Sequence, residues 1–275
     1  MTSSTSRSLT AYSVRQWTEP TGGAEDQRER GGVDRVWIGT SGWSYDHWDG
    51  VLYGPSLAPA RRLERYVQEF DTVELNASFY RWPREQTFRH WRRRLPTGFR
   101  MSVKAPRGLS HGRRLYRPET WMPRLVGCWH ELADRRGVLL VQLPPDQERD
   151  DDRLDYFLRN LPTWLQVAVE LRHPSWHTDP VFDLLSRHGA AYVVMSGARL
   201  PCILRATSTT VYLRLHGPDQ DHLYGGSYSE ADLHWWADRL REWQRHGHDV
   251  FAYFNNDGNG HAVTNARGLR ALVGG

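Results

Sequence analysis

The chain has 275 residues, of which 39% are hydrophobic, so it is long enough to bury one large core or two small ones. No stretch approaches the roughly 18 apolar residues of a transmembrane helix, and the first residues lack the apolar core of a secretory signal. Two cysteines, Cys128 and Cys202, fit neither a disulfide framework nor a paired-cysteine metal motif. This composition argues against membrane proteins and disulfide-rich secreted proteins, and it predicts a soluble cytoplasmic protein.

Strand-like and helical segments alternate along most of the chain. Residues 1–32 are rich in Ser, Thr, Gly and charge without periodicity, so we expect a disordered leader there. The predicted strands cover residues 35–39, 72–76, 99–104, 137–143, 166–172, 190–195, 210–216 and 250–255. Helical patterns lie between them, and the weakest follows the sixth strand, where Pro201 leaves room only for a short or irregular helix.

Eight strands that alternate with helices indicate parallel pairing through right-handed crossovers. No linker-like segment interrupts the alternation, so a single (β/α)8 TIM barrel over residues 33–275 explains the count better than two domains. A doubly wound open sheet is the alternative, but its usual Gly-x-Gly-x-x-Gly turn is absent after the first strand.

The chain contains one lysine, Lys104, against 35 arginines. Arginine is evidently used wherever positive charge alone is enough. We therefore expect Lys104, at the end of the third strand, to occupy a tight, partly buried position that needs a compact amine with a tunable pKa. The alternatives are chance survival of one lysine or a buried structural ion pair.

Positive charge is concentrated in one part of the chain. The net charge is +4, yet residues 81–117 contain eleven arginines and Lys104 against a single acid, Glu85. A basic stretch attracts phosphates and is typical of nucleic-acid binding. The alternative, which we favour for its helical part, is a solvated helix face and a basic loop balanced by the acidic segment 146–152.

Polar residues at the strand ends are the candidate site residues, because TIM-barrel active sites lie at the C-terminal ends of the strands. Alternation places Glu74 and Asn76 on one face of the second strand, and Glu170 and Arg172 on one face of the fifth. The others are Lys104, Gln142, His173, Arg214, His216, Asn255, Asn256 and Asp257. Burying them unpaired would be costly, so we expect them to share a polar mouth. The alternative is that the glutamates simply pair with Arg172 or Arg214.

The loops add aromatic and basic candidates. Trp43, Trp176 and Tyr224 could stack on sugar rings or bases, or could merely cover the barrel rim. Arg107 and His111 could hold a phosphate or carboxylate.

We assign no cofactor and no metal site from the sequence. There is no His-x-His pair and no His-Glu-x-x-His motif. A divalent metal, kept as a lesser alternative, would need ligands from separate strands: Glu74, Glu170, His216 and Asp257.

Seven segments at these strand ends resemble the YecE-like family, a domain of unknown function numbered 72 (DUF72). They are residues 38–45, 73–81, 99–107, 141–145, 169–176, 212–217 and 253–257. The resemblance implies a TIM barrel but no activity, because the function of the family is unsettled. The family pattern has an aspartate at the end of the sixth strand, whereas residues 193–196 read Val-Val-Met-Ser, so no role of that aspartate carries over.

Our leading hypothesis is an enzyme, a hydrolase, lyase or isomerase, that acts on a small anionic, sugar-like or phosphorylated substrate. Lys104 would supply positive charge or an amine nucleophile for a Schiff base. Glu74 or Glu170 would be the general acid or base, and His216 a second proton-transfer group. One alternative is a nucleic-acid-binding protein or a metal-dependent endonuclease-like barrel, and another is a non-catalytic ligand-binding or scaffold protein.

Overall fold

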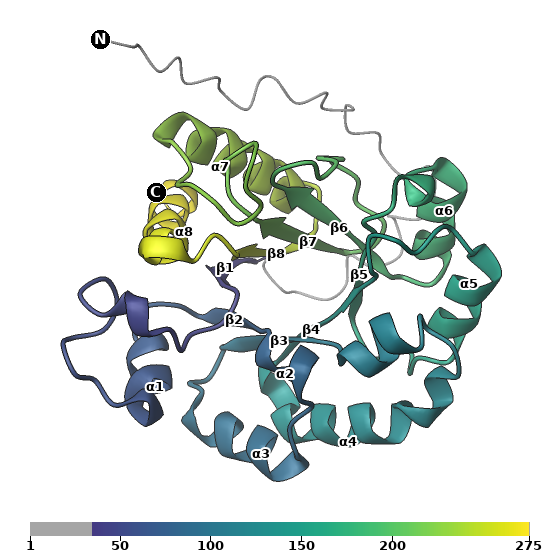
Figure 1. Cartoon of the computed structure of the whole chain (residues 1–275), viewed down its shortest axis with the longest axis horizontal. Helices are drawn as coiled ribbons and strands as arrows, with labels where there is room; N and C mark the ends of the chain where they lie inside the picture. Colours follow the sequence, from purple (N-terminus) through teal and green to yellow (C-terminus); the bar gives the residue numbers. More distant parts are fainter. Residues whose placement is uncertain (1–34, 275) are drawn as a thin grey trace.

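The computed structural model describes residues 35–274, so the expected leader, residues 1–32, lies outside the described residues (Figure 1). The strands are β1 (Val36–Thr40), β2 (Thr72–Leu75), β3 (Arg100–Lys104), β4 (Arg136–Gln142), β5 (Val167–Glu170), β6 (Ala191–Ser196), β7 (Thr210–Leu215) and β8 (Asp249–Phe254). The helices are α1 (Arg62–Tyr66), α2 (Ala77–Tyr80), α3 (Glu85–Arg94), α4 (Met122–Leu132), α5 (Asp151–Arg159), α6 (Asp179–Arg187), α7 (Glu230–Arg245) and α8 (His261–Val273). All eight predicted strands are present, and their ends lie within two residues of the prediction.

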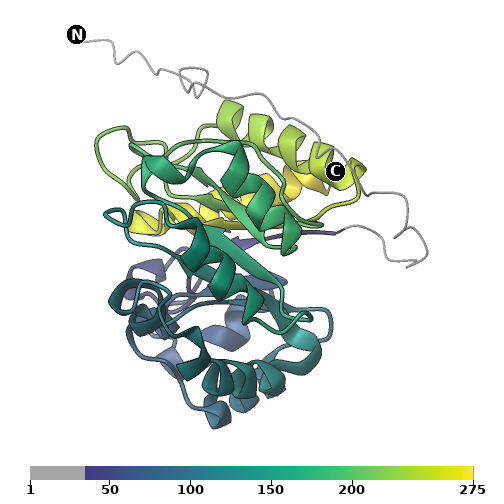
Figure 2. The same ribbon diagram turned by 90° about the vertical axis from the view of Figure 1, so that its right-hand side faces the viewer.

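The strands form one parallel sheet in the order β1-β8-β7-β6-β5-β4-β3-β2, with the helices around its outside (Figures 1 and 2). The two edge strands meet through a bridge between Ser41 and Glu74, so the barrel is nearly closed. Gly39 permits this approach, since a Cβ atom there would lie 2.3 Å from the carbonyl oxygen of Thr72. The barrel prediction is confirmed, and the open doubly wound alternative is wrong.

The barrel encloses its own apolar cluster, separate from the larger core between strands and helices. The inward-facing members are Trp37, Val138, Leu140, Ala168, Ala191, Val193, Met195, Tyr212, Phe251 and Tyr253. They occupy alternate positions on their strands, because successive side chains of a strand point to opposite faces. The same alternation carries the polar residues near the strand ends into the barrel.

Two of the connections that follow strands differ in their local structure. As expected from Pro201, the described connection from β6 to β7 contains no helix. The loop from β7 to α7 ends in a capping box, in which Ser229 Oγ accepts from the backbone N–H of Asp232 and the Asp232 carboxylate accepts from that of Ser229.

Among residues 35–274, no helix is both long enough and apolar enough to cross a bilayer.

Candidate functional site

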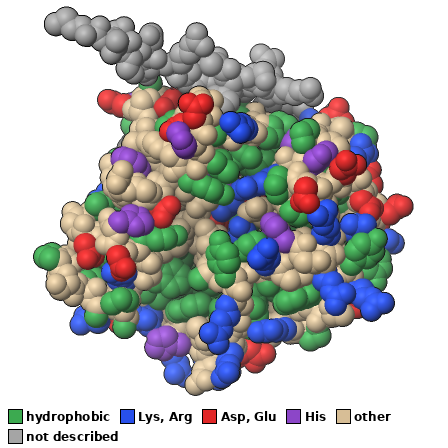
Figure 3. Space-filling view, viewed as in Figure 1, with side chains coloured by type: hydrophobic (Ala, Val, Ile, Leu, Met, Phe, Trp, Pro, Cys, Tyr) green, Lys and Arg blue, Asp and Glu red, His purple; other side chains and the backbone are tan. Residues whose placement is uncertain are grey.

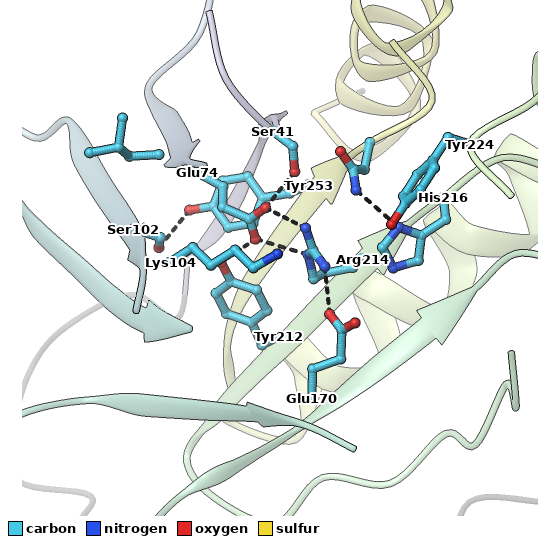
Figure 4. Close-up of polar contacts among 12 residues, drawn as sticks. Ser41, Glu74, Ser102, Lys104, Glu170, Tyr212, Arg214, His216, Tyr224 and Tyr253 are labelled. Atoms are coloured by element: carbon cyan, nitrogen blue, oxygen red, sulfur yellow. Dashed lines mark hydrogen bonds and ion pairs between the residues drawn. The ribbon is translucent and has the colours of Figure 1, made fainter. Parts of the chain in front are cut away.

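Three buried charged side chains meet near the C-terminal ends of the strands (Figure 4). They are Glu74 of β2, Glu170 of β5 and Arg214 of β7, each at most 1% exposed. Arg214 donates to Glu74 from Nε at 3.1 Å and from Nη2 at 2.8 Å, and its Nη1 donates to Glu170 at 2.6 Å. Burial alone would lower the pKa of Arg214, but Glu170 and Glu74 outweigh it and hold that pKa above its ordinary value.

The carboxylate of Glu74 accepts four hydrogen bonds. Two come from Arg214; Ser41 Oγ donates to Oε1 at 2.5 Å, and the hydroxyl of Tyr212 donates to Oε2 at 2.7 Å. A carboxylate offers about four lone-pair positions, so all the accepting capacity of Glu74 is used within the protein. This geometry is that of a held carboxylate rather than of a free base.

Arg172, two residues beyond Glu170, connects the buried charges to the rim. Its Nε donates to Glu170 Oε1 at 2.6 Å, and its Nη2 donates to the hydroxyl of Tyr224 at 3.4 Å. Burial opposes ionisation of Glu170, but Arg214 and then Arg172 outweigh it, so the pKa of Glu170 lies well below its usual range. We call Glu74, Glu170, Arg172 and Arg214 the ion-pair network. The network lies in the mouth, meaning the C-terminal strand ends and the loops that follow them.

A chain of hydroxyl hydrogen bonds forms the layer beneath the network. Thr72 Oγ1 donates to the carbonyl of Arg100 at 2.8 Å, so the Tyr253 hydroxyl, 2.6 Å away, donates to Thr72 Oγ1. Ser102 Oγ then donates to the Tyr253 oxygen at 2.9 Å, and it accepts from the backbone N–H of Val138 at 3.0 Å. Each hydroxyl in this layer therefore has partners, and the layer offers a rigid floor to the mouth.

Lys104 ends β3 beside the network, and its amine makes no hydrogen bond or ion pair with any described residue. Its Nζ lies 4.2 Å from the centre of the Phe79 ring, against which His111 also packs at 4.9 Å. Burial and then Arg214 lower the pKa of Lys104 to about 7. Burial and then Lys104 lower the pKa of His111 to about 4. The expectation of a partly buried amine with an altered pKa agrees with this geometry.

His216 follows β7 and is completely buried. Asn255 Nδ2 lies 3.1 Å from its Nδ1; because an amide nitrogen donates, Nδ1 accepts and the ring proton lies on Nε2. That Nε2 has no hydrogen-bond partner among the described residues. Burial and then Arg214 hold the pKa of His216 well below its usual range, so the imidazole is neutral. The edge of the Tyr224 ring covers it, with ring centres 5.3 Å apart.

Three of the candidate residues make packing or loop contacts instead. Trp176 is 1% exposed and donates from its indole to the carbonyl of Gln147 at 2.8 Å. Trp43 packs edge-on against Trp91 of α3 at 5.7 Å. Asn256 is buried and donates to the carbonyl of Gly226, which holds the loop between β7 and α7. For both tryptophans, these contacts agree with the alternative of covering the barrel.

Three further candidates lie at the ends of the loops. His173 Nδ1 lies 2.8 Å from the hydroxyl of Ser175 in its own turn. Asp257 lies 3.6 Å from His47 Nε2, across the mouth-side loops after β8 and β1. Arg107 is exposed, one residue after Pro106. The structure does not join these residues to the ion-pair network.

Two predicted site residues on the inner side of the barrel remain, Gln142 and Asn76. Gln142 is buried at the end of β4 opposite Glu170 in register, and the Oδ1 atom of Asn76 is buried without a partner among the described residues.

The roles of Ser41, Tyr212 and Phe79 near the network were not predicted from the sequence. For Tyr212, the signal was its alternation with Arg214 and His216; no signal in the sequence identified the other two.

The geometry does not fit the metal alternative. No group of three His, Cys, Asp or Glu side chains in the described part of the chain could hold an ion. Of the four ligands considered, Glu74 and Glu170 are bound by Arg214, and Asp257 is beside His47.

Three of the basic residues of segment 81–117 are paired with acids. Arg89 donates twice to Glu131 of α4, and Arg94 pairs with Glu64 at 3.3 Å. In the loop, Arg114 pairs at 2.6 Å with Asp146. Figure 3 shows basic side chains and a histidine gathered around a hollow near the centre of the face viewed there.

Comparisons with known proteins bear on the fold and the family. Residues 37–275 match the family described as "Protein of unknown function DUF72". UPF0759 protein YunF of Bacillus subtilis is 26% identical over 271 residues, which cover 86% of this chain and 94% of that protein. UPF0759 protein YecE of Escherichia coli K12 is 30% identical over 142 residues, about half of each chain at 51% and 50%.

Solved structures agree with this match. A DUF72 family protein from Thermotoga maritima has a TM-score of 0.78 and 27% identity, and the alignment covers 87% of this chain and 99% of that one. A DUF72 family protein from Enterococcus faecalis has a TM-score of 0.72 with 17% identity, covering 87% and 96%, and supports the fold alone.

Proposed function

The chain belongs to the DUF72 family, whose function is unknown, and we propose that its mouth is the active site of an enzyme that acts on a small anionic substrate. The observation that carries this proposal is the amine of Lys104. It is the single lysine of the chain, it lies at a strand end where barrel enzymes place catalytic groups, and no described side chain neutralises it.

The electrostatics of the mouth favour an anion. In the ion-pair network, two arginines balance two glutamates, so Lys104 and the exposed Arg107 add positive charge that the network does not cancel. The pKa of His111 reports the same field. After burial, the groups that lower it are Lys104, Arg107 and Arg172. A bound carboxylate or phosphate would relieve this repulsion.

The nitrogen atoms without protein partners are the ones that we assign to contact with a substrate. The carboxylate of Glu74 is fully hydrogen-bonded, and Glu170 is held by two arginines, so we assign both glutamates to positioning Arg214. Lys104 Nζ and His216 Nε2 remain without protein partners, so we assign proton transfer or nucleophilic attack to them. Of the four residues predicted to be catalytic, we therefore keep Lys104 and His216 in that role, and we assign Glu74 and Glu170 to positioning.

A thermal-shift screen of the wild type and Lys104→Met tests the proposal. The panel holds inorganic phosphate, a hexose phosphate, lactate and pyruvate, each at low and moderate salt. A ligand at a hundred times its Kd stabilises a protein by about 2.7 kcal/mol, so we expect at least one anion to raise the Tm of the wild type and not that of Lys104→Met.

The matched control is Arg89→Met, which removes a positive charge from the exposed face of α3. It should keep every shift of the wild type. Equal shifts in wild type and Lys104→Met, or no shift with any anion, would contradict the proposal. Anion binding without turnover of any bound compound would instead indicate a non-catalytic binding protein.

A further inference from the structure

We propose that the substrate of the mouth is an anionic carbonyl compound, an aldehyde or ketone bearing a carboxylate or phosphate, which forms a Schiff base with the amine of Lys104. This inference rests on the proposed function and names its substrate class. Three features carry it: an unpaired amine, an unpaired imidazole N–H, and arginines that leave the amine without a carboxylate partner.

The first feature is the choice of an amine where arginines already supply the charge. Arg172 and Arg214 lie in the same network, and a guanidinium stays protonated at every physiological pH. A lysine adds what they lack, which is a nitrogen able to lose its proton and attack an electrophile. If only a fixed positive charge were needed at position 104, an arginine would serve, as it does at the other basic positions of the chain.

The second feature is that the surroundings lower the pKa of the amine. The two glutamates that could stabilise an ammonium at Lys104 are hydrogen-bonded to Arg214 instead, and the Phe79 ring covers one side of the amine. With its pKa lowered to about 7, first by burial and then by Arg214, about half of the Lys104 amines are neutral at neutral pH. An ordinary lysine is almost entirely protonated there.

The third feature is a hydrogen-bond donor for the carbonyl oxygen. Asn255 fixes the tautomer of His216 that carries its proton on Nε2, and this buried N–H has no acceptor in the described protein. A neutral imidazole beside cationic groups can polarise a carbonyl without becoming an imidazolium. Figure 4 shows Lys104 and His216 flanking Arg214 at the same end of the strands, so both belong to the surroundings of one ligand in this proposal.

The anionic part of the substrate has partners at the rim. Arg172 uses Nε and Nη2 within the protein and keeps further N–H groups, and Arg107 is exposed just beyond Lys104. Guanidinium groups bind carboxylates and phosphates through paired N–H donors. Tyr224, which is 41% exposed, closes this side of the mouth.

The step balances without a further reactant. The lone pair of the neutral Lys104 amine attacks the carbonyl carbon, forming a C–N bond as the C=O π bond breaks. The carbinolamine oxygen takes both N–H protons in turn and leaves as water, which yields the imine. His216 Nε2–H donates a hydrogen bond to the oxygen while negative charge develops on it.

Borohydride trapping tests the proposal directly, because the chain has only two amines, Lys104 and the α-amino group. The intact protein is incubated with pyruvate, glyoxylate or dihydroxyacetone phosphate, reduced, digested and analysed by mass spectrometry. We expect saturable labelling of the peptide that contains Lys104, at least about tenfold faster than labelling of the α-amine. Acetone and dihydroxyacetone, the uncharged counterparts, should label Lys104 at the slow α-amine rate.

Two variants serve as controls. Lys104→Arg keeps the charge and should lose the internal label, while Lys104→Met provides a second check if the larger side chain disturbs the fold. Labelling of Lys104 no faster than of the α-amine with all three probes would overturn the Schiff base. If lactate and glycerol phosphate still shift the Tm of the wild type but not of Lys104→Met, the proposed function survives that failure.

Discussion

The two ends of the barrel interior are filled by different chemistry. Near the N-terminal strand ends, Trp37 stacks on Phe251 with ring centres 4.6 Å apart, within the apolar cluster. Near the C-terminal ends, Arg214 bridges two buried glutamates, and Lys104 and His216 keep unpaired nitrogen atoms. One strand, β7, contributes to both ends: its inward-facing Tyr212 belongs to the apolar cluster, and its inward-facing Arg214 belongs to the ion-pair network. Apolar packing at one end supplies stability, and it supports costly polar groups at the other.

Open space alone does not identify the site. A cavity of about 630 Å³ opens at the N-terminal end, lined in part by Trp37, Asp71, Phe99 and Arg270. The described residues there form no counterpart of the ion-pair network. The difference therefore lies in converging charges and unpaired polar atoms, which point to the mouth as the place where a ligand would be recognised.

The largest expected effect comes from removing the charge at the centre of the mouth. Arg214→Met leaves Glu74 and Glu170 buried without their counter-ion, so we expect a loss of about 3–5 kcal/mol in the free energy of unfolding. Urea unfolding at neutral pH measures it. Because the pKa of Glu170 is held low in the folded protein, its contribution to stability is lost as the pH falls through that folded value.

The matched control is an exposed pair of the same chemistry. Arg89→Met removes the partner of Glu131 on the helical layer, where ion pairs contribute roughly 0–1 kcal/mol. If Arg214→Met and Arg89→Met lost similar amounts of unfolding free energy, the buried network would be no more costly to break than a surface pair. The mouth would then not differ from the helical layer in this respect.

The next effect has the opposite sign, because Lys104 destabilises the fold. Its pKa falls from 10.5 in the unfolded chain to about 7 in the folded protein, so the unfolded state binds the proton more tightly between these values. The stability of the wild type should therefore rise with pH from about 7 towards 10.5. At pH 6, where the cost is complete, Lys104→Met should be more stable by roughly 1–3 kcal/mol, and the difference should shrink as the pH rises.

Denaturant unfolding of both proteins across this range gives the comparison. A gain in stability combined with a loss of anion binding is the signature of a residue kept for function rather than for folding. A Lys104→Met variant that is less stable than the wild type at pH 6 would show that the lysine is a structural residue.

Much of the fold was predictable from the sequence because of how barrel strands are buried. Strands covered on both faces appear as short apolar runs, and polar residues at alternate positions near their ends indicate the mouth. Alternation predicts Glu74 and Glu170 on the polar side of their strands, and Arg214 is predicted as a strand-end residue that shares the mouth with them or simply pairs with them. Lys104 was identified by composition alone.

The partners inside the site could not be predicted in the same way. Tyr212 reads as an ordinary strand residue, and only the closed barrel brings its hydroxyl to Glu74, 138 positions away. Trp43 and Trp176 illustrate the opposite problem, since a loop tryptophan has the same sequence signature whether it stacks on a ligand or packs on the protein. The roles of the site residues stay predictions until ligand binding is measured.

The smallest expected effect is at the other end of the barrel. Asp71 is exposed beside the N-terminal cavity, and Asp71→Asn removes its charge with little change in volume. Surface substitutions of this kind usually change stability by less than about 0.5 kcal/mol, so we expect an almost unchanged unfolding curve. The anion-induced Tm shifts and the trapping of Lys104 should be identical to those of the wild type. If Asp71→Asn weakened either, the two ends of the barrel would be coupled, and the cavity at the N-terminal end would have to be included in the functional site.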